Sequence, residues 1–179
     1  LDAALRFTNM PKEYYSDWLE VAEDEIRHFK MIEGLMHELD VNYGDIVVHT
    51  NLYEAMIQTD TLLKRMAVVP RFLEANGLDQ NPKIMEKLKS NNDAMNRKII
   101  EALQVILDEE IDHVSKGDRW FKYACSNENV EPEETYLNII EEFYPGSTTR
   151  KLEMNFEARK AAGFSCDELK RLSNQKECE

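Results

Sequence analysis

Apolar residues recur along two long segments in alternating steps of three and four residues, the spacing of the buried stripe of an amphipathic helix. The first segment runs from Pro11 to Asp40, and the second from about Asp93 to Cys125. Both stripes contain polar residues where a helix would ordinarily bury leucine. The stripes are Tyr14, Trp18, Val21, Glu25, His28, Ile32, Leu35 and Leu39, and then Ile99, Leu103, Ile106, Glu110, His113, Gly117, Trp120 and Ala124.

Between these segments the pattern predicts an extended connection over residues 40–50 and a third helix over residues 51–76. We expect this helix to kink at Pro70, because proline lacks the N–H of an interior helical bond. Gly77 is expected to end the helix at the C′ position. The letters "LDQNP" are then expected to break the chain before a short helix from Pro82 to about Ser90.

The two ends of the chain are also predicted to be helical. Residues 1–8 are typical of the last turns of a helix that begins upstream of Leu1, so we expect the first helix to be truncated. Near the other end, a helix is expected over residues 132–143, "YPGS" is expected to form a turn, and the capping-box pattern of Ser165 with Glu168 predicts a last short helix.

These elements together predict an all-α fold. We expect a four-helix bundle over residues 1–125, followed by a C-terminal helical extension over residues 126–179 that packs on the bundle.

Composition narrows the classes of partner and compartment. The chain has 179 residues with 42% hydrophobic and 32% charged residues, and no apolar run approaches the ~20 residues of a membrane span. The net charge of −13 argues against nucleic acid or an anionic membrane as a partner. Three widely spaced cysteines with no CxxC pair predict reduced thiols, and therefore a cytoplasmic protein.

Two ExxH motifs occupy the polar interruptions of the stripes, Glu25 with His28 and Glu110 with His113. Residues three apart on a helix share a face, so each pair can bind one metal ion. Burying carboxylates without a positive partner costs several kcal/mol each, and neither stripe supplies lysine or arginine at a neighbouring core position. Divalent cations would resolve this conflict, so the two motifs predict a metal site.

Dinuclear carboxylate bundles add one glutamate from each of the other two helices. In the third helix the candidates are Glu54, on a polar stripe, and Glu74, on the buried stripe, and Glu74 is preferred. The remaining ligand is expected to be Asp2 or a residue upstream of Leu1. The buried stripe comprises Met56, Leu63, Ala67 and Pro70, and the polar stripe comprises Gln58, Thr61 and Arg65.

The stretches "EVAEDEIRHFKMI", "LYEA", "MAVVPRFLEANGLD", "ILDEEIDHVSKGDRWF" and "EARKAAGFS" carry a resemblance that covers essentially the whole chain. The sequence is similar to an uncharacterised family of ferritin-like domain proteins. The resemblance implies a ferritin-like bundle with a dinuclear iron site. It also implies metal ligands at Glu25, His28, Glu74, Glu110 and His113.

The ligand types decide the expected function. Hard oxygen donors without thiolates suit two iron ions, or manganese. We therefore expect an O2-dependent oxidase or hydroxylase that acts on a small-molecule substrate, as a monomer or homo-oligomer. Two alternatives stay open: an iron-handling ferroxidase, and a non-enzymatic interaction module with a structural or vestigial metal site.

Overall fold

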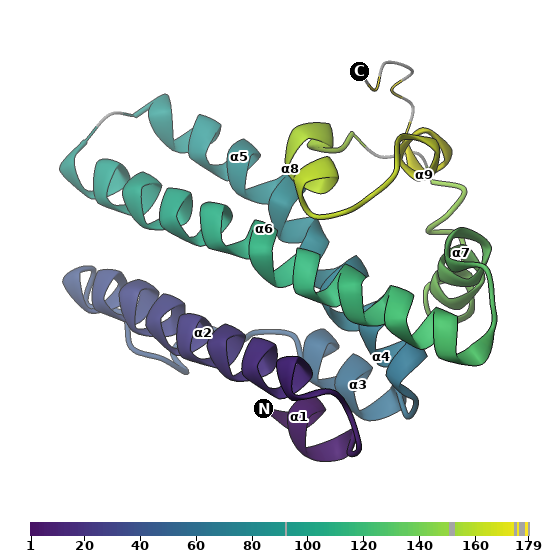
Figure 1. Ribbon diagram of the computed structural model, residues 1–179. Coiled ribbons are helices and arrows are strands. Elements are labelled where there is room, and N and C mark those ends of the chain that lie inside the picture. Colours follow the sequence, from purple (N-terminus) through teal and green to yellow (C-terminus); the bar gives the residue numbers. More distant parts are fainter. Residues whose placement is uncertain (92, 151–152, 174, 176–177, 179) are drawn as a thin grey trace. The chain divides into compact units, whose positions relative to one another are not determined.

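The computed structural model describes residues 1–91, 93–150, 153–173, 175 and 178 (Figure 1). These residues form helices and loops, with no β-strand among them, which confirms the all-α prediction. None of the described helices combines the length and apolar character needed to cross a membrane. The chain divides into two compact units, one of residues 1–51 and 81–109 and the other of residues 52–80 and 110–179. The expected division at residue 125 falls inside a helix and stays a prediction.

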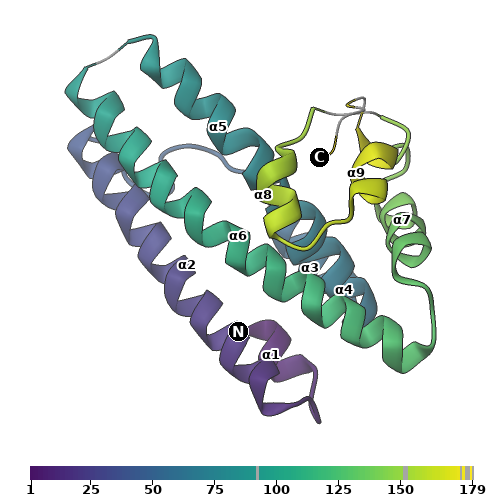
Figure 2. The same cartoon turned by 45° about the horizontal axis from the view of Figure 1, so that its top comes forward.

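The first unit contains α1 (Asp2–Arg6), α2 (Lys12–Glu38), the end of α5 (Ala75–Lys89) and the beginning of α6 (Ala94–Glu128). α2 and the first half of α6 run side by side (Figure 1 and Figure 2), and Lys98 of α6 pairs with Glu38 of α2 at 2.5 Å. α1 packs on α2, where the Tyr14 hydroxyl donates to the Ala3 carbonyl at 3.1 Å. The two long helices predicted from the stripes are therefore confirmed.

The second unit contains the remaining helices and the rest of α5 and α6. In it α4 packs against α7 and continues directly into a π-helical segment, η1. The helices predicted over 132–143 and after Ser165 are confirmed, the latter with its capping box, whereas α8 was not foreseen. These elements are α3 (Asn51–Gln58), α4 (Leu62–Val68), η1 (Val69–Glu74), α7 (Pro132–Phe143), α8 (Phe156–Ala161) and α9 (Cys166–Leu172).

The single third helix predicted over residues 51–76 is wrong in its first half, because the chain breaks between α3 and α4. The Thr59 N–H and hydroxyl both donate to the Ala55 carbonyl, at 3.1 and 2.7 Å, where α3 ends. Thr61 then caps α4 by accepting from the Lys64 N–H at 3.2 Å.

The irregularity predicted at Pro70 is confirmed, and it takes the form of the π-helical segment η1. Pro70 lies against Gly117 of α6. A Cβ atom on Gly117 would stand 2.5 Å from the Pro70 Cβ, a distance that no real pair of side chains adopts. The glycine is therefore what admits the proline ring at this crossing.

The predicted helix end at Gly77 and break before Pro82 are both wrong, because α5 runs through them from Ala75 to Lys89. Pro82 has no N–H for the carbonyl of Leu78, four residues earlier. The Asn155 side chain supplies the missing donor, with its Nδ2 3.3 Å from the Leu78 oxygen. A contact distant in the sequence therefore repairs the helix.

Buried ion pairs hold the C-terminal helices in the second unit. Arg71 of η1 is 1% exposed and donates to Asp118 at 2.8 Å and Glu168 at 2.7 Å. Burial acts to lower the pKa of Arg71, but the adjacent carboxylates outweigh it and raise that pKa. Arg159 of α8 forms a second buried pair with Asp79 of α5, at 2.6 Å.

The prediction of three reduced cysteines is wrong for two of them. Cys166 and Cys178 form a disulfide, with their Cα atoms 5.6 Å apart. Their separation of 12 residues, without a CxxC spacing, gave no local sign that the chain returns on itself after α9. Cys125 is free and buried, and burial raises the pKa of its thiol to about 11.

The predicted turn at "YPGS" is confirmed, and Glu141 of α7 stabilises it. The Glu141 carboxylate accepts from the Gly146 N–H at 2.8 Å and from the Thr148 hydroxyl at 2.6 Å. The hydrogen bond from Thr148, followed by that from Gly146, lowers the pKa of Glu141. Ionised Glu141 therefore stabilises the folded turn above the ordinary glutamate pKa, and this stabilisation is lost as the pH falls through the lowered value.

We expect Thr148→Ala to raise the pKa of Glu141 toward its ordinary value, measured by NMR titration of the side-chain carboxyl carbon. Thr149→Ala is the matched control, because the Thr149 hydroxyl donates to the Gly146 carbonyl at 3.0 Å and does not bond Glu141. Identical titration curves for the wild type and Thr148→Ala would contradict the assignment.

Candidate metal centre

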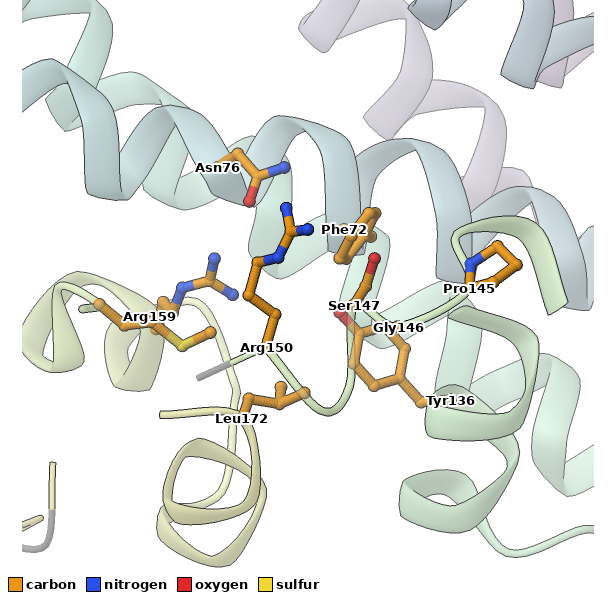
Figure 3. Close-up of a pocket in the computed structure, with 10 residues that line it drawn as sticks. Phe72, Asn76, Tyr136, Pro145, Gly146, Ser147, Arg150, Arg159 and Leu172 are labelled. Carbon is orange, nitrogen blue, oxygen red and sulfur yellow. The ribbon is translucent and has the colours of Figure 1, made fainter. Parts of the chain in front are cut away.

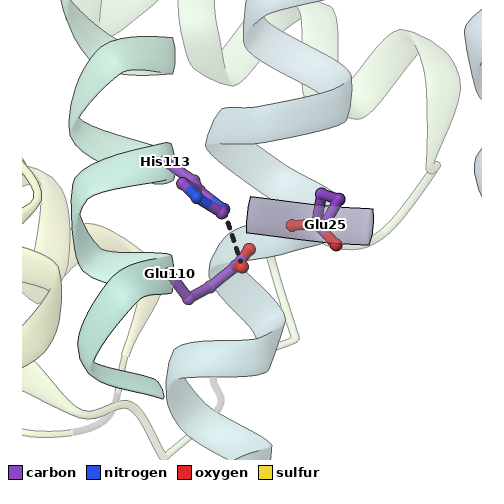
Figure 4. A group of neighbouring side chains, drawn as sticks. All are labelled: Glu25, Glu110 and His113. Carbon is purple, nitrogen blue, oxygen red and sulfur yellow. Dashed lines mark ion pairs between the residues drawn. The ribbon is translucent and has the colours of Figure 1, made fainter. Parts of the chain in front are cut away.

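The second ExxH pair lies on α6 in the second unit, and both of its side chains are buried. Glu110 is 8% exposed and His113 is fully buried. The Glu110 Oε2 atom lies 3.3 Å from the His113 Nδ1 atom, the ion pair dashed in Figure 4. The prediction that both residues occupy core positions is confirmed.

The stripe itself carries no lysine or arginine beside this pair, but the structure buries a cation next to the stripe. Lys116, one turn after His113, is 7% exposed, and its Nζ atom lies 2.5 Å from the Asp112 Oδ2 atom. Lysine can bury its aliphatic stem while the ammonium group reaches an acid one turn back on the same helix. This cation therefore offsets part of the negative charge along α6, with Asp112 as its ion-pair partner.

Glu74, the preferred third ligand, is the last residue of η1 and belongs to the same unit. It is half-buried, and its Oε2 atom is withdrawn from solvent. Three residues later on α5, a Cβ atom at Gly77 would lie 3.9 Å from the Glu110 Cγ atom, so this stretch of chain runs beside Glu110. The rejected alternative, Glu54, is exposed on α3. Burial therefore agrees with the choice of Glu74.

The first ExxH pair lies on α2 in the first unit and is only half buried. His28 is 5% exposed, but the Glu25 side chain is 49% exposed, so the prediction of a buried Glu25 is wrong. On the stripe of α2, Val21 and His28 are buried and Glu25 between them is exposed, as are Ile26 and Phe29 beside the stripe. The helical period identified the face correctly, but it could not say which positions on that face are covered.

His28 is held by a carboxylate that the sequence analysis did not single out. Its Nε2 atom lies 2.6 Å from the Glu109 Oε2 atom, and its Nδ1 atom lies 3.8 Å from the Glu25 Oε1 atom. Arg27 reaches the same Glu109 oxygen at 2.6 Å. Partial burial raises the pKa of Glu109, but the hydrogen bonds from His28 and Arg27 outweigh it and lower that pKa.

Asp2, the fourth ligand considered, forms an ion pair with Arg6 at 3.0 Å within α1. The structure therefore gives Asp2 a partner one turn away. Of the predicted ligands, it brings Glu110 to His113 and places His28 between two carboxylates.

Comparison with known proteins finds a matching family and a similar protein. Residues 1–170 match the family described as "Protein of unknown function (DUF455)". The chain is 32% identical over 177 residues to an uncharacterized protein of Haemophilus influenzae, an alignment that covers 94% of this chain and 60% of that protein. The chain thus spans about 60% of the length of this relative. No solved structure matches the chain.

Proposed function

The chain belongs to the DUF455 family of proteins of unknown function, and we propose that it is a dinuclear iron or manganese protein with an O2-dependent oxidase or hydroxylase activity. The proposed ligands are Glu25, His28, Glu74, Glu110 and His113. The two ExxH pairs on two long helices, with a glutamate from another helix, make up most of the ligand pattern of ferritin-like bundles, which has one further glutamate. We therefore also propose the ferritin-like bundle as the finer description of the fold.

The observation that carries the proposal is the buried Glu110–His113 pair. A fully buried imidazole 3.3 Å from a nearly buried carboxylate is a ready pair of metal ligands on one helical face. Glu110 and His113 can each offer one ligand atom (Figure 4). Because these donors are carboxylate oxygens and imidazole nitrogens, they suit iron or manganese.

Residues around the proposed ligands orient His28 and exclude water from His113. Arg27 and Glu109 fix the ring of His28 from its Nε2 side. Exclusion of water around His113 strengthens its interaction with Glu110. When bound, a pair of ferrous ions would supply the electrons and open coordination positions that O2 chemistry needs.

One observation favours a second candidate function. In the first unit, His28 is already paired with Glu109, and Arg27 pairs with the same carboxylate, so His28 has a partner without a metal ion. This favours a non-enzymatic interaction module with a structural or vestigial metal site. A ferroxidase would use the same ligands and differs only in lacking an organic substrate.

We expect the protein, loaded anaerobically with ferrous iron and desalted, to retain about two metal ions per chain. His113→Ala and Glu110→Gln are each expected to lower this count to about one or less, because each removes a ligand that the proposed site cannot replace. Elemental analysis measures the count directly. Glu54→Gln is the matched control, since it removes one exposed glutamate of the rejected stripe.

A count in His113→Ala equal to that in Glu54→Gln would refute the metal site. Exposing the ferrous protein to air then distinguishes an O2-using protein from a non-enzymatic module. Visible absorbance changes are expected of an oxidase, a hydroxylase or a ferroxidase. Iron that binds but stays redox-silent would leave the structural module as the function.

A further inference from the structure

A cavity of about 210 Å³ lies within the second unit, away from the ExxH residues. One wall is formed by η1 and the first turn of α5, another by the turn after α7, and a third by α8 and α9 (Figure 3). The volume is below the ~300–1,000 Å³ typical of pockets for drug-sized ligands, so it suits a smaller molecule.

Apolar and aromatic side chains supply much of the cavity wall. Phe72, Tyr136 and Leu172 all face it. The Tyr136 hydroxyl donates to the Arg71 carbonyl at 3.3 Å, and burial raises the pKa of Tyr136 to about 12, so this wall stays neutral. The body of a ligand would therefore meet apolar surface.

Two arginines also line the cavity, and they differ in how they are paired. Arg159 is 2% exposed, and Asp79 neutralises it through bonds from both Nε and Nη2. The Arg150 guanidinium forms no ion pair with any residue in the described ranges, and it reaches toward Phe72 and Asn76 (Figure 3). Arg150 is an exposed residue, so its guanidinium is open to a ligand that enters from solvent.

Two neutral polar groups face the same cavity. The Asn76 side-chain amide and the Ser147 hydroxyl make no hydrogen bond within the part of the chain that the structure describes. Ser147 stands on the turn that Glu141 stabilises through the Gly146 N–H. The cavity thus combines one guanidinium, one amide and one hydroxyl, all of them able to donate, with apolar walls.

We propose that this cavity binds a small organic carboxylate with an apolar body, such as an aromatic or short aliphatic acid. A guanidinium matches a carboxylate with two parallel N–H bonds, and Asn76 and Ser147 add neutral donors. A phosphate dianion fits less well, because Arg150 is the one cation here that lacks an internal partner among the described residues. The proposal does not rest on the metal site, since neither Glu110 nor His113 lines the cavity.

The test titrates the full chain with benzoate and with hexanoate, using calorimetry for affinity and methionine methyl NMR for location. Met154 lines the cavity, so its methyl signal, assigned with Met154→Leu, is expected to shift on binding. Arg150→Gln is expected to weaken binding by about tenfold or more, because the charge-assisted bonds are lost. Arg119→Gln, an equal change of charge at an exposed residue of α6 that does not line the cavity, is expected to bind like the wild type.

Benzamide and inorganic phosphate complete the comparison. We expect both to bind at least about tenfold more weakly than benzoate, since benzamide lacks the charge and phosphate lacks the apolar body. Circular dichroism checks that Arg150→Gln is folded. The proposal is overturned if neither acid binds, if Arg150→Gln binds like Arg119→Gln, if benzamide or phosphate equals benzoate, or if the Met154 methyl signal does not move.

Discussion

Replacing Arg71 with methionine is expected to lower the free energy of unfolding by about 3–5 kcal/mol, because Glu168 loses its buried cation and Asp118 keeps only the half-exposed Lys122 as an ion-pair partner. Both carboxylates are withdrawn from solvent, with 5% and 3% exposure. The guanidinium also lies 4.1 Å from the centre of the Tyr136 ring, so a cation–π contact is lost as well. Urea unfolding, followed by circular dichroism, measures the change.

Arg171→Met is the matched control. Arg171 likewise contacts two acids, Glu133 and Glu134, but its side chain is 45% exposed, so the same substitution is expected to have little effect. A triple variant that adds Asp118→Asn and Glu168→Gln to Arg71→Met should recover part of the loss, because the stranded charges are removed. Equal stabilities of Arg71→Met and Arg171→Met would show that the buried network does not stabilise the fold.

Gly117→Ala is expected to be the second most damaging substitution, at about 1–3 kcal/mol of lost stability. The added methyl group would lie 2.5 Å from the Pro70 Cβ and 2.7 Å from its Cγ, and a proline ring cannot rotate away. Either α6 or η1 must shift, and η1 carries Arg71 into its ion pairs. Thermal unfolding and urea unfolding both measure the loss.

Gly34→Ala is the same chemical change as Gly117→Ala, but it is expected to raise the stability. Gly34 is an exposed residue of α2, and a Cβ there would meet no atom within 4 Å. Alanine is favoured over glycine in a helix interior by about 0.5–1 kcal/mol, so this variant should be more stable than the wild type. If the Gly117→Ala protein were as stable as Gly34→Ala, the close packing of α6 against η1 would not be required for stability.

The long helices could be predicted because their evidence is local. The stripes of α2 and α6 repeat over many turns, so the period identifies both the helix and its inner face. The same reasoning located Glu110 and His113 in the core. It failed for Glu25, because a period identifies a face of the helix and not which positions on that face the neighbouring elements cover.

The missed features depend on residues far apart in the sequence. Pro82 reads as a helix breaker until Asn155 satisfies the carbonyl of Leu78. Arg71 meets partners that lie 47 and 97 residues away, so no local pattern could pair them. Glu109 was overlooked because it stands beside Glu110, which fitted the ExxH spacing, and only the fold brings it to His28.

Each of the two compact units contains one tryptophan. Of the 2 tryptophans, Trp18 belongs to the first unit and Trp120 to the second, and both are buried. Because α5 and α6 each pass through both units, the mechanical link between them is continuous helical backbone. Replacing either tryptophan with phenylalanine leaves one fluorescent tryptophan, which lies in the other unit. The intrinsic fluorescence of the two single-tryptophan proteins therefore reports separately on each unit, and measures without an attached label how tightly their melting is coupled.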